Sequence, residues 1–167
     1  QPLFQAPVEK LSLMRLDGDT WAPIPFQIDQ KTPDGSYAYD EGPEAAEDPA
    51  PGLDGNDELT FMVKDTGDRC DHCAWPQGAA RGVEVTVEDP LDNGKAWVYL
   101  LCFAGSAPRS GEDYVRVELD YEKGYRKVHT YEYVMGGPMD CIYPDLIRAS
   151  TLPDGSPCLM PSWALPE

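Results

Sequence analysis

Residues 83–103 decide the fold class, and they read VEVTVEDPLDNGKAWVYLLCF. Three valines alternate with polar side chains over residues 83–88, which is the period of a strand with one buried face. Asn93-Gly94 is a strong signal for a tight hairpin turn. The run from Ala96 to Phe103 is apolar on both alternations, as in a central strand covered on both sides. This segment therefore predicts an antiparallel hairpin whose second strand lies inside the core.

Residues 11–29 predict a second hairpin. Leu11–Leu16 leads into an Asp-Gly-Asp turn, and the return over residues 21–29 carries Pro23 and Pro25 in one alternation. Their missing N–H groups point to the same side, which a strand tolerates only at the edge of a sheet. We therefore expect residues 23–29 to form an edge strand.

Further segments complete the predicted strand content. Val115–Tyr121 and Tyr125–Met135 form a third hairpin around Glu122-Lys123-Gly124, and Leu59–Val63 is a separate strand. No stretch shows a convincing 3.6-residue apolar repeat. The sequence thus predicts an all-β fold, an antiparallel β-sandwich of the Ig-like or jelly-roll-like kind.

Two regions depart from the strand period. Residues 30–57 are rich in acids and proline, which predicts a long loop. Residues 136–167 are rich in proline and glycine and predict an extended segment that packs on the domain or on a partner. The expected organisation is one β-sandwich domain over residues 1–135, with an acidic insertion at 30–57, followed by a C-terminal segment at 136–167.

The chain is strongly acidic. Its 13 Lys and Arg residues stand against 30 Asp and Glu residues, for a formal net charge of −17. Nucleic acid and anionic membrane surfaces repel such a chain, and basic proteins attract it. No apolar run approaches the roughly 18 residues of a transmembrane helix. The expected partner is a basic protein or a membrane-complex subunit, and the candidate contacts are acids of the insertion: Asp40, Glu41, Glu44, Glu47 and Asp48.

A group of tyrosines supplies a second candidate surface. Tyr125, Tyr131 and Tyr133 share one alternation of the expected strand 125–135. Aromatic side chains on one sheet face are typical of surfaces that bind sugars or proteins. The alternative is that the same side chains form one layer of the sandwich core.

Residues 54–58 suggest a calcium site. Asp54, Asn56 and Glu58 alternate, with Asp57 between them, and a tight loop could direct their oxygens at one hard cation. The segment is not an EF-hand, because Leu59 stands at the sixth position, where that loop requires glycine. The alternative is an acidic Asx-turn that leads into the next strand.

The cysteines indicate an oxidising compartment. There are five, at positions 70, 73, 102, 141 and 158, so one is left without a partner inside the chain. Cys102 lies in an apolar run and is expected to be a buried hydrophobe, whereas Cys141 and Cys158 could be bridged. The chain also begins at Gln1 rather than Met, which fits an exported protein whose signal peptide has been removed.

The segment Cys70-Asp71-His72-Cys73 permits three interpretations. It could bind a metal, cycle as a redox pair, or form a local disulfide that tightens a loop. It is not a haem-attachment motif, because Ala74 stands where that motif has histidine. No motif of a serine hydrolase, zinc protease, phosphate loop or dinucleotide site is present. We therefore assign no catalytic residue and no certain cofactor, and expect a protein that is not an enzyme.

Two phrases carry a family resemblance. Residues 25–29 read PFQID and residues 56–62 read NDELTFM. Together they resemble a loose family of exported bacterial β-sandwich domains, of uncharacterised function, that join two such strands by an acidic insertion. The resemblance covers roughly residues 8–105. It implies export to the periplasm or the extracellular space and brings no catalytic residues; some similar sequences accompany polysaccharide-degrading proteins and others lie near multihaem or membrane electron-transfer systems.

These observations favour a non-enzymatic accessory or interaction subunit. The expected setting is a periplasmic or extracellular assembly, for instance a cytochrome-containing electron-transfer complex or a membrane complex. One alternative is a calcium-stabilised domain that binds or acts on carbohydrate. A second alternative is a redox module that uses Cys70 and Cys73.

Overall fold

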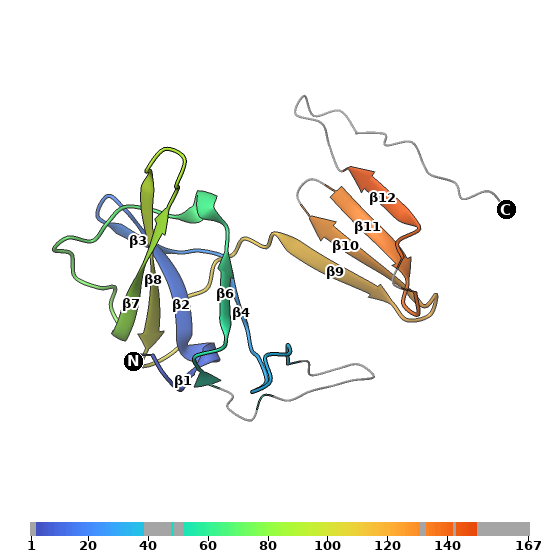
Figure 1. The fold of residues 1–167 in the computed structure, drawn as a ribbon, viewed down its shortest axis with the longest axis horizontal. Helices are drawn as coiled ribbons and strands as arrows, with labels where there is room; N and C mark the ends of the chain where they lie inside the picture. The colour runs from blue at the N-terminus through green and yellow to red at the C-terminus, as the bar shows by residue number, and fades with distance from the viewer. Residues whose placement is uncertain (1–2, 39–47, 49–51, 131–132, 142, 150–167) are drawn as a thin grey trace. The chain divides into compact units, whose positions relative to one another are not determined.

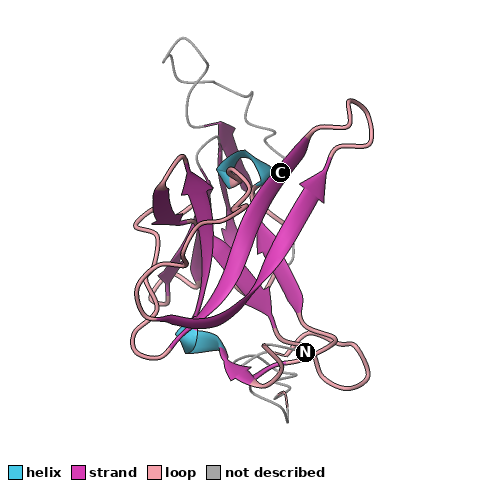
Figure 2. Ribbon diagram, turned by 90° about the vertical axis from the view of Figure 1, so that its left-hand side faces the viewer, coloured by secondary structure: helices cyan, strands magenta, loops and turns pink. Residues whose placement is uncertain are grey.

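The computed structural model describes residues 3–38, 48, 52–130, 133–141 and 143–149. In these residues the fold is all-β, with antiparallel pairing throughout and two short 3-10 helices, as expected from the sequence (Figures 1 and 2). The elements are β1 Ala6–Pro7, η1 Val8–Lys10, β2 Leu11–Asp17, β3 Thr20–Pro23, β4 Phe26–Asp29, β5 Gly52–Leu53, β6 Glu58–Phe61, η2 Val63–Asp65, β7 Ala79–Glu88, β8 Lys95–Phe103, β9 Val115–Asp120, β10 Tyr125–Thr130, β11 Tyr133–Pro138 and β12 Leu146–Ala149.

The chain divides into two compact units, Gln1–Glu112 and Asp113–Glu167. Unit 1 contains β1 to β8, and unit 2 contains β9 to β12. No helix in the described part of the chain is long and apolar enough to cross a membrane.

Unit 1 is built on a four-stranded sheet of order β3-β2-β8-β7. Strand β8 lies between β2 and β7 and is buried from Val98 to Phe103. The predicted central strand is therefore confirmed. The loop between β7 and β8 is longer than a two-residue turn, since the Asp89 N–H donates to the Gly94 carbonyl at 2.9 Å and Asn93 takes a positive φ of 61°.

Both faces of this sheet are covered. On one face a core cluster includes Leu11, Leu13, Val98 and Leu100, and the β4-β6 ladder packs against it with Phe26, Ile28, Leu59 and Phe61. On the other face a second cluster is formed by Met14, Leu16, Tyr99, Leu101, Phe103 and Ala107, with Trp21 and Cys70 packed against it. Sheet, ladder and covering loop give unit 1 a sandwich architecture.

The expected edge strand 23–29 changes sheet part-way. Pro23 ends β3, which is an edge strand, as the proline pattern predicted. The Ile24 N–H still donates to the Leu13 carbonyl of β2 at 2.9 Å, and the chain leaves the four-stranded sheet at Pro25, after which β4 pairs with β6. Residues 23–29 are therefore two strands in two layers, because the second proline interrupts the ladder.

Unit 2 is a four-stranded sheet of order β12-β11-β10-β9, seen side by side in Figure 1. The expected domain boundary at residue 135 does not coincide with this unit, since β11 and β12 extend the sheet to Ala149. Strand β11 was not predicted in full because it contains two glycines, which are uncommon in strands. A Cβ on Gly136 would lie 3.0 Å from the Tyr125 ring, and one on Gly137 would lie 2.9 Å from the Tyr143 carbonyl oxygen, so both positions serve close approach within a strand.

Candidate interaction surface

One face of the unit 2 sheet is apolar. Val128 of β10 is opposite Val117 of β9 and Met135 of β11, and Met135 is opposite Ile147 of β12. These four side chains form a row across the sheet, because cross-strand partners share a face. Strand alternation adds three more apolar members to what we call the apolar face: Val115, Leu119 and Tyr133. The polar members Thr130 and Arg126 lie opposite Val115 and Leu119 on the same face.

The apolar face is open to solvent. Five of its members are 42–56% exposed: Val115, Val117, Leu119, Tyr133 and Ile147. Val128 and Met135, in the two central strands, are half-buried. A contiguous apolar surface of this kind on a soluble protein typically marks a site of interaction.

The opposite face of the same sheet is charged. Glu118 of β9 accepts a hydrogen bond from the His129 ring at 3.0 Å and lies 3.7 Å from Lys127 Nζ. The hydrogen bond from His129, followed by the charge of Lys127, lowers the pKa of Glu118. Arg116 is exposed on this face as well. The charged face is thus suited to contact with solvent, and the apolar face is suited to contact with another protein.

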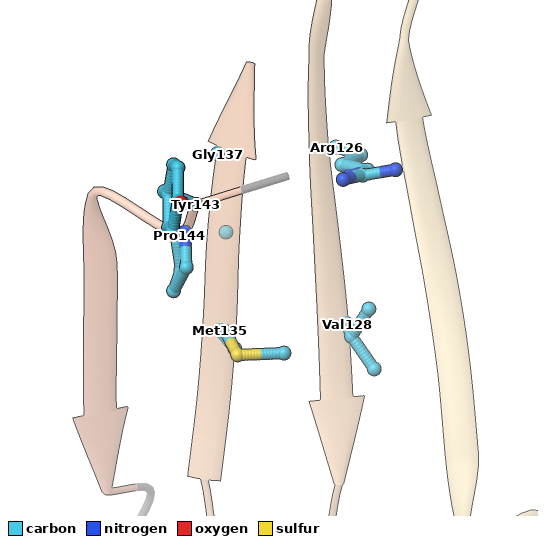
Figure 3. A pocket seen from close by; sticks show the side chains of 7 residues that line it. Arg126, Val128, Met135, Gly137, Tyr143 and Pro144 are labelled. Atoms are coloured by element: carbon cyan, nitrogen blue, oxygen red, sulfur yellow. The ribbon is translucent and has the colours of Figure 1, made fainter. Parts of the chain in front are cut away.

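The apolar face contains a hollow of about 50 Å³. Val128 and Met135 line one side of it, and Tyr143 and Pro144 pass beside Gly137 at the other (Figure 3). Arg126 also lines the hollow, and its Nη2 donates to the Cys141 carbonyl at 2.9 Å. This hydrogen bond holds the segment before β12 in place and so fixes the shape of the hollow.

The structure does not bring the predicted tyrosines together. Tyr125 and Tyr133 lie on opposite faces, because Tyr133 shares a face with Met135 and its partner Val128, and Tyr125 is three residues from Val128. Tyr131 lies outside the described residues. The expected single strand 125–135 was wrong: β10 ends at Thr130, and the Tyr133 N–H donates to the Thr130 hydroxyl at 3.0 Å.

Tyr125 has a structural role instead. Its ring lies over Gly136, and its hydroxyl donates to the Asp145 carboxylate. That hydrogen bond, with burial and the negative charge of Asp145, raises the pKa of Tyr125 to about 12.

This pKa predicts an alkaline transition. An unfolded tyrosine titrates near pH 10, so the stability that the bond contributes is complete below roughly pH 10 and is lost as the pH rises through about 12. We expect an ultraviolet titration to show one late-titrating tyrosine that Tyr125→Phe removes. The control is Tyr121→Phe, at a side chain 74% exposed. Titration of Tyr125 together with the exposed tyrosines would contradict the assignment.

The base of the acidic insertion is anchored to β6. Residues 31 and 37 pair as an isolated β-bridge, Lys31 forms an ion pair with Glu58, and the Tyr37 hydroxyl donates to Glu58 at 3.0 Å. These hydrogen bonds, with that of Lys31 the larger, lower the pKa of Glu58. Among the predicted partner contacts Asp48 is half-buried, and four lie outside the described residues: Asp40, Glu41, Glu44 and Glu47.

The predicted calcium residues form hydrogen bonds within their loop and with residues 31–32. Asp57 accepts the backbone N–H groups of Lys31 and Asp54 on its two carboxylate oxygens, at 3.1 and 2.9 Å. The Asn56 side-chain amide donates to the carbonyls of Lys31 and Thr32, at 3.2 and 2.9 Å. Asn56 therefore presents its N–H group, rather than its oxygen, to residues 31–32. Within the loop the Asn56 backbone N–H donates to Asp54 Oδ1 at 3.0 Å, which is the geometry of an Asx-turn.

Asn56→Asp separates the two interpretations of this loop. It replaces two donated hydrogen bonds by a carboxylate facing two carbonyls, so we expect a loss of about 2 kcal/mol in the free energy of unfolding. Asn93→Asp, the same change at an exposed loop position, should change it by less than about 0.5 kcal/mol. The measurement is urea denaturation with EDTA and with added Ca²⁺. A calcium-dependent gain in stability for the wild-type chain would contradict the hydrogen-bonding role.

Cys70 and Cys73 form a disulfide, with their Cα atoms 5.3 Å apart. The surrounding loop is fixed to the sheet, because the Cys70 N–H donates to the Tyr99 hydroxyl at 2.6 Å and the Trp21 indole donates to the Ala74 carbonyl at 2.9 Å. Burial raises the pKa of Tyr99, whose hydroxyl also donates to Glu84. The disulfide thus closes a loop that covers the second core cluster.

The remaining cysteines are placed as follows. Cys102 is 6% exposed, as expected of a buried hydrophobe. Cys141 is half-buried and forms no disulfide among the described residues, and its expected partner Cys158 lies outside them. No group of three or more His, Cys, Asp or Glu side chains suited to a metal occurs within the described part of the chain.

A scan against protein-family models matched no family, and searches of curated proteins and of solved structures found no match. The case for function therefore depends on the geometry of the chain itself.

Sequence reasoning missed the apolar face. The sequence predicted the strand that carries Val115, Val117 and Leu119, but it did not predict whether the face of these side chains is covered. Residues 11–103 already contain enough apolar side chains for one core. The apolar side chains of residues 115–119 lie outside that segment, and this could have indicated that they form a separate surface.

Proposed function

We propose that this chain is a non-enzymatic interaction module of an exported assembly, and that it docks on a protein partner through the apolar face of unit 2. The observation that carries the proposal is the exposure of that face, from Val115 on one edge strand to Ile147 on the other. The partner surface is an apolar strip bordered by lysine and arginine, for the two reasons that follow.

The hollow on the apolar face indicates an apolar side chain on the partner. Interface energy concentrates in a few apolar or aromatic side chains that enter desolvated pockets. The hollow between Val128, Met135 and Tyr143 is a receptor of this kind, and strand β9, which pairs with the strand of Val128, adds exposed valines and a leucine on the same face.

The basic part is argued from charge. Unit 1 carries 21 acids and 8 bases, a net charge of −13, whereas unit 2 carries 9 acids and 5 bases, a net charge of −4. Residues 30–57 alone carry 8 acids and 1 base. The negative field therefore originates mainly outside the apolar face, where it would accelerate the approach of a basic protein.

The test is a comparison of immobilised chains with an extract of the native source. Wild-type chain and Arg116→Asp should retain the same protein, because Arg116 lies on the charged face next to Val117. Val117→Asp should lose it, and raised salt should weaken its retention. Equal retention by Val117→Asp, or a partner whose own surface is acidic, would overturn the proposal.

A further inference from the structure

Strand β7 is an edge strand with a long open side. It pairs with β8 over nine residue pairs and ends the sheet order of unit 1. Its other side pairs with no strand that the structure describes. The strand contains no proline, and its only irregularity is a register shift between Ala79 and Arg81. Proteins usually protect such edges, because free N–H and C=O groups invite another strand.

The hairpin geometry shows which groups of β7 are free. At its end the Asp89 N–H donates to the Gly94 carbonyl, so the hydrogen-bonded pairs with β8 include residues 89, 87, 85 and 83. Residues 82, 84, 86 and 88 therefore direct their N–H and C=O groups outward. These four outward positions are Gly82, Glu84, Thr86 and Glu88.

The side chains beside this edge are incompletely covered. Val83, Val85 and Val87 share the sheet face of the first core cluster, and Val85 packs against that cluster. Val83 is 37% exposed, and Val85 and Val87 are half-buried. A strand added at this edge would bury this valine row and satisfy the outward backbone groups together.

We propose that the added strand is β7 of a second copy of this chain, paired antiparallel about a two-fold axis at Val85. In this register the outward residues meet one another: Glu84 faces Thr86 of the second copy, and Gly82 faces its Glu88. Each such pair exchanges both of its N–H···O bonds. The two sheets then continue as one across the axis.

Charge excludes the two adjacent registers. An axis at Glu84 would place Glu84 against its own copy, and an axis at Thr86 would place Glu84 against Glu88, and like charges directly opposite are destabilising. The axis at Val85 avoids both. It also places Arg81 opposite Asp89 and Val83 opposite Val87, so that the face of the first core cluster gains an ion pair and continuous apolar contact.

The salt dependence separates this contact from the proposed function. Two chains of −17 repel one another, so added salt should strengthen self-association. Salt should weaken the binding of a basic partner. The two contacts also use different units, and each can fail without the other.

Sedimentation equilibrium of the full chain tests the proposal. Wild-type chain should form a dimer that tightens with salt. Thr86→Pro removes an outward N–H without removing a bond to β8, so it should abolish the dimer, whereas Thr86→Val keeps the N–H and should preserve it. Circular dichroism checks that each variant is folded.

Two charged variants at position 86 test the same contact if Thr86→Pro does not fold. Thr86→Glu places two new Glu–Glu contacts in each dimer and should weaken it by roughly tenfold, and Thr86→Lys should strengthen it by roughly tenfold. A chain that is monomeric at all salt concentrations would overturn the proposal. So would a dimer that tolerates Thr86→Glu, or one that is lost in Val117→Asp instead.

Discussion

Leu101→Ala is expected to lower the free energy of unfolding of unit 1 by about 2–5 kcal/mol, and Leu13→Ala should lower it by a similar amount. Both side chains are fully buried. They lie on opposite faces of the same sheet, Leu13 in the first core cluster and Leu101 in the second. The pair therefore tests whether the sheet is covered on both sides.

Urea denaturation monitored by tryptophan fluorescence measures both losses. The control is Leu91→Ala, at a side chain 92% exposed, which should change the free energy by less than about 0.5 kcal/mol. A cost below about 1 kcal/mol for Leu101→Ala alone would mean that the loop closed by the Cys70–Cys73 disulfide does not seal the second cluster.

Val117→Asp should weaken binding of the purified partner by at least about 100-fold, mainly through faster dissociation. A carboxylate inserted into an apolar contact must lose its hydration without gaining a hydrogen bond, and a 100-fold loss corresponds to about 2.8 kcal/mol. The stability of the free chain should be unchanged, because Val117 is 56% exposed.

The acidic insertion should act on a different rate. Replacing Asp40, Glu41, Glu44 and Glu47 by their amides should slow association by about tenfold at low salt and leave dissociation nearly unchanged. Surface plasmon resonance separates the two rates.

For Val117→Asp, a loss of stability in the free chain would contradict the account, because it would show that the apolar face is buried within the chain.

Local patterns were sufficient for the central hairpin of unit 1. The β7–β8 hairpin follows from alternating valines, a turn signal and a doubly apolar run, all of which depend on neighbours in sequence. Pro23 correctly indicated an edge. The change of layer at Pro25 was not predicted, because it depends on whether β4 finds β2 or β6 as its partner.

Unit 2 was harder because its decisive features are contacts between distant residues. Gly136 and Gly137 look like coil until the Tyr125 ring and the Tyr143 carbonyl are seen beside them. Alternation assigns Val115, Val117 and Leu119 to one face, but only packing decides whether that face is covered. The sequence between Thr130 and Tyr133 contains no glycine or proline, so it gave no signal that the strand ends there. Tyr125, Tyr131 and Tyr133 were therefore wrongly assigned to one strand.

The predicted sites were limited in a similar way. The sequence shows that Asn56 has a side-chain oxygen that could bind a metal, but its side chain has a hydrogen-bond donor as well as an acceptor. The carbonyls of Lys31 and Thr32, 25 and 24 residues away, determine that the donor is used. The Cys70–Cys73 disulfide was among the stated interpretations because its geometry is local.

The most direct test of the central claim is the rate of thiol labelling on the apolar face. Val117→Cys should react with a maleimide at a rate close to that of Arg116→Cys on the charged face, and far faster than the buried native Cys102. In the partner-bound assembly Val117→Cys should become protected while Arg116→Cys stays reactive. Slow labelling of Val117→Cys in the isolated chain, or unchanged labelling in the assembly, would contradict the account.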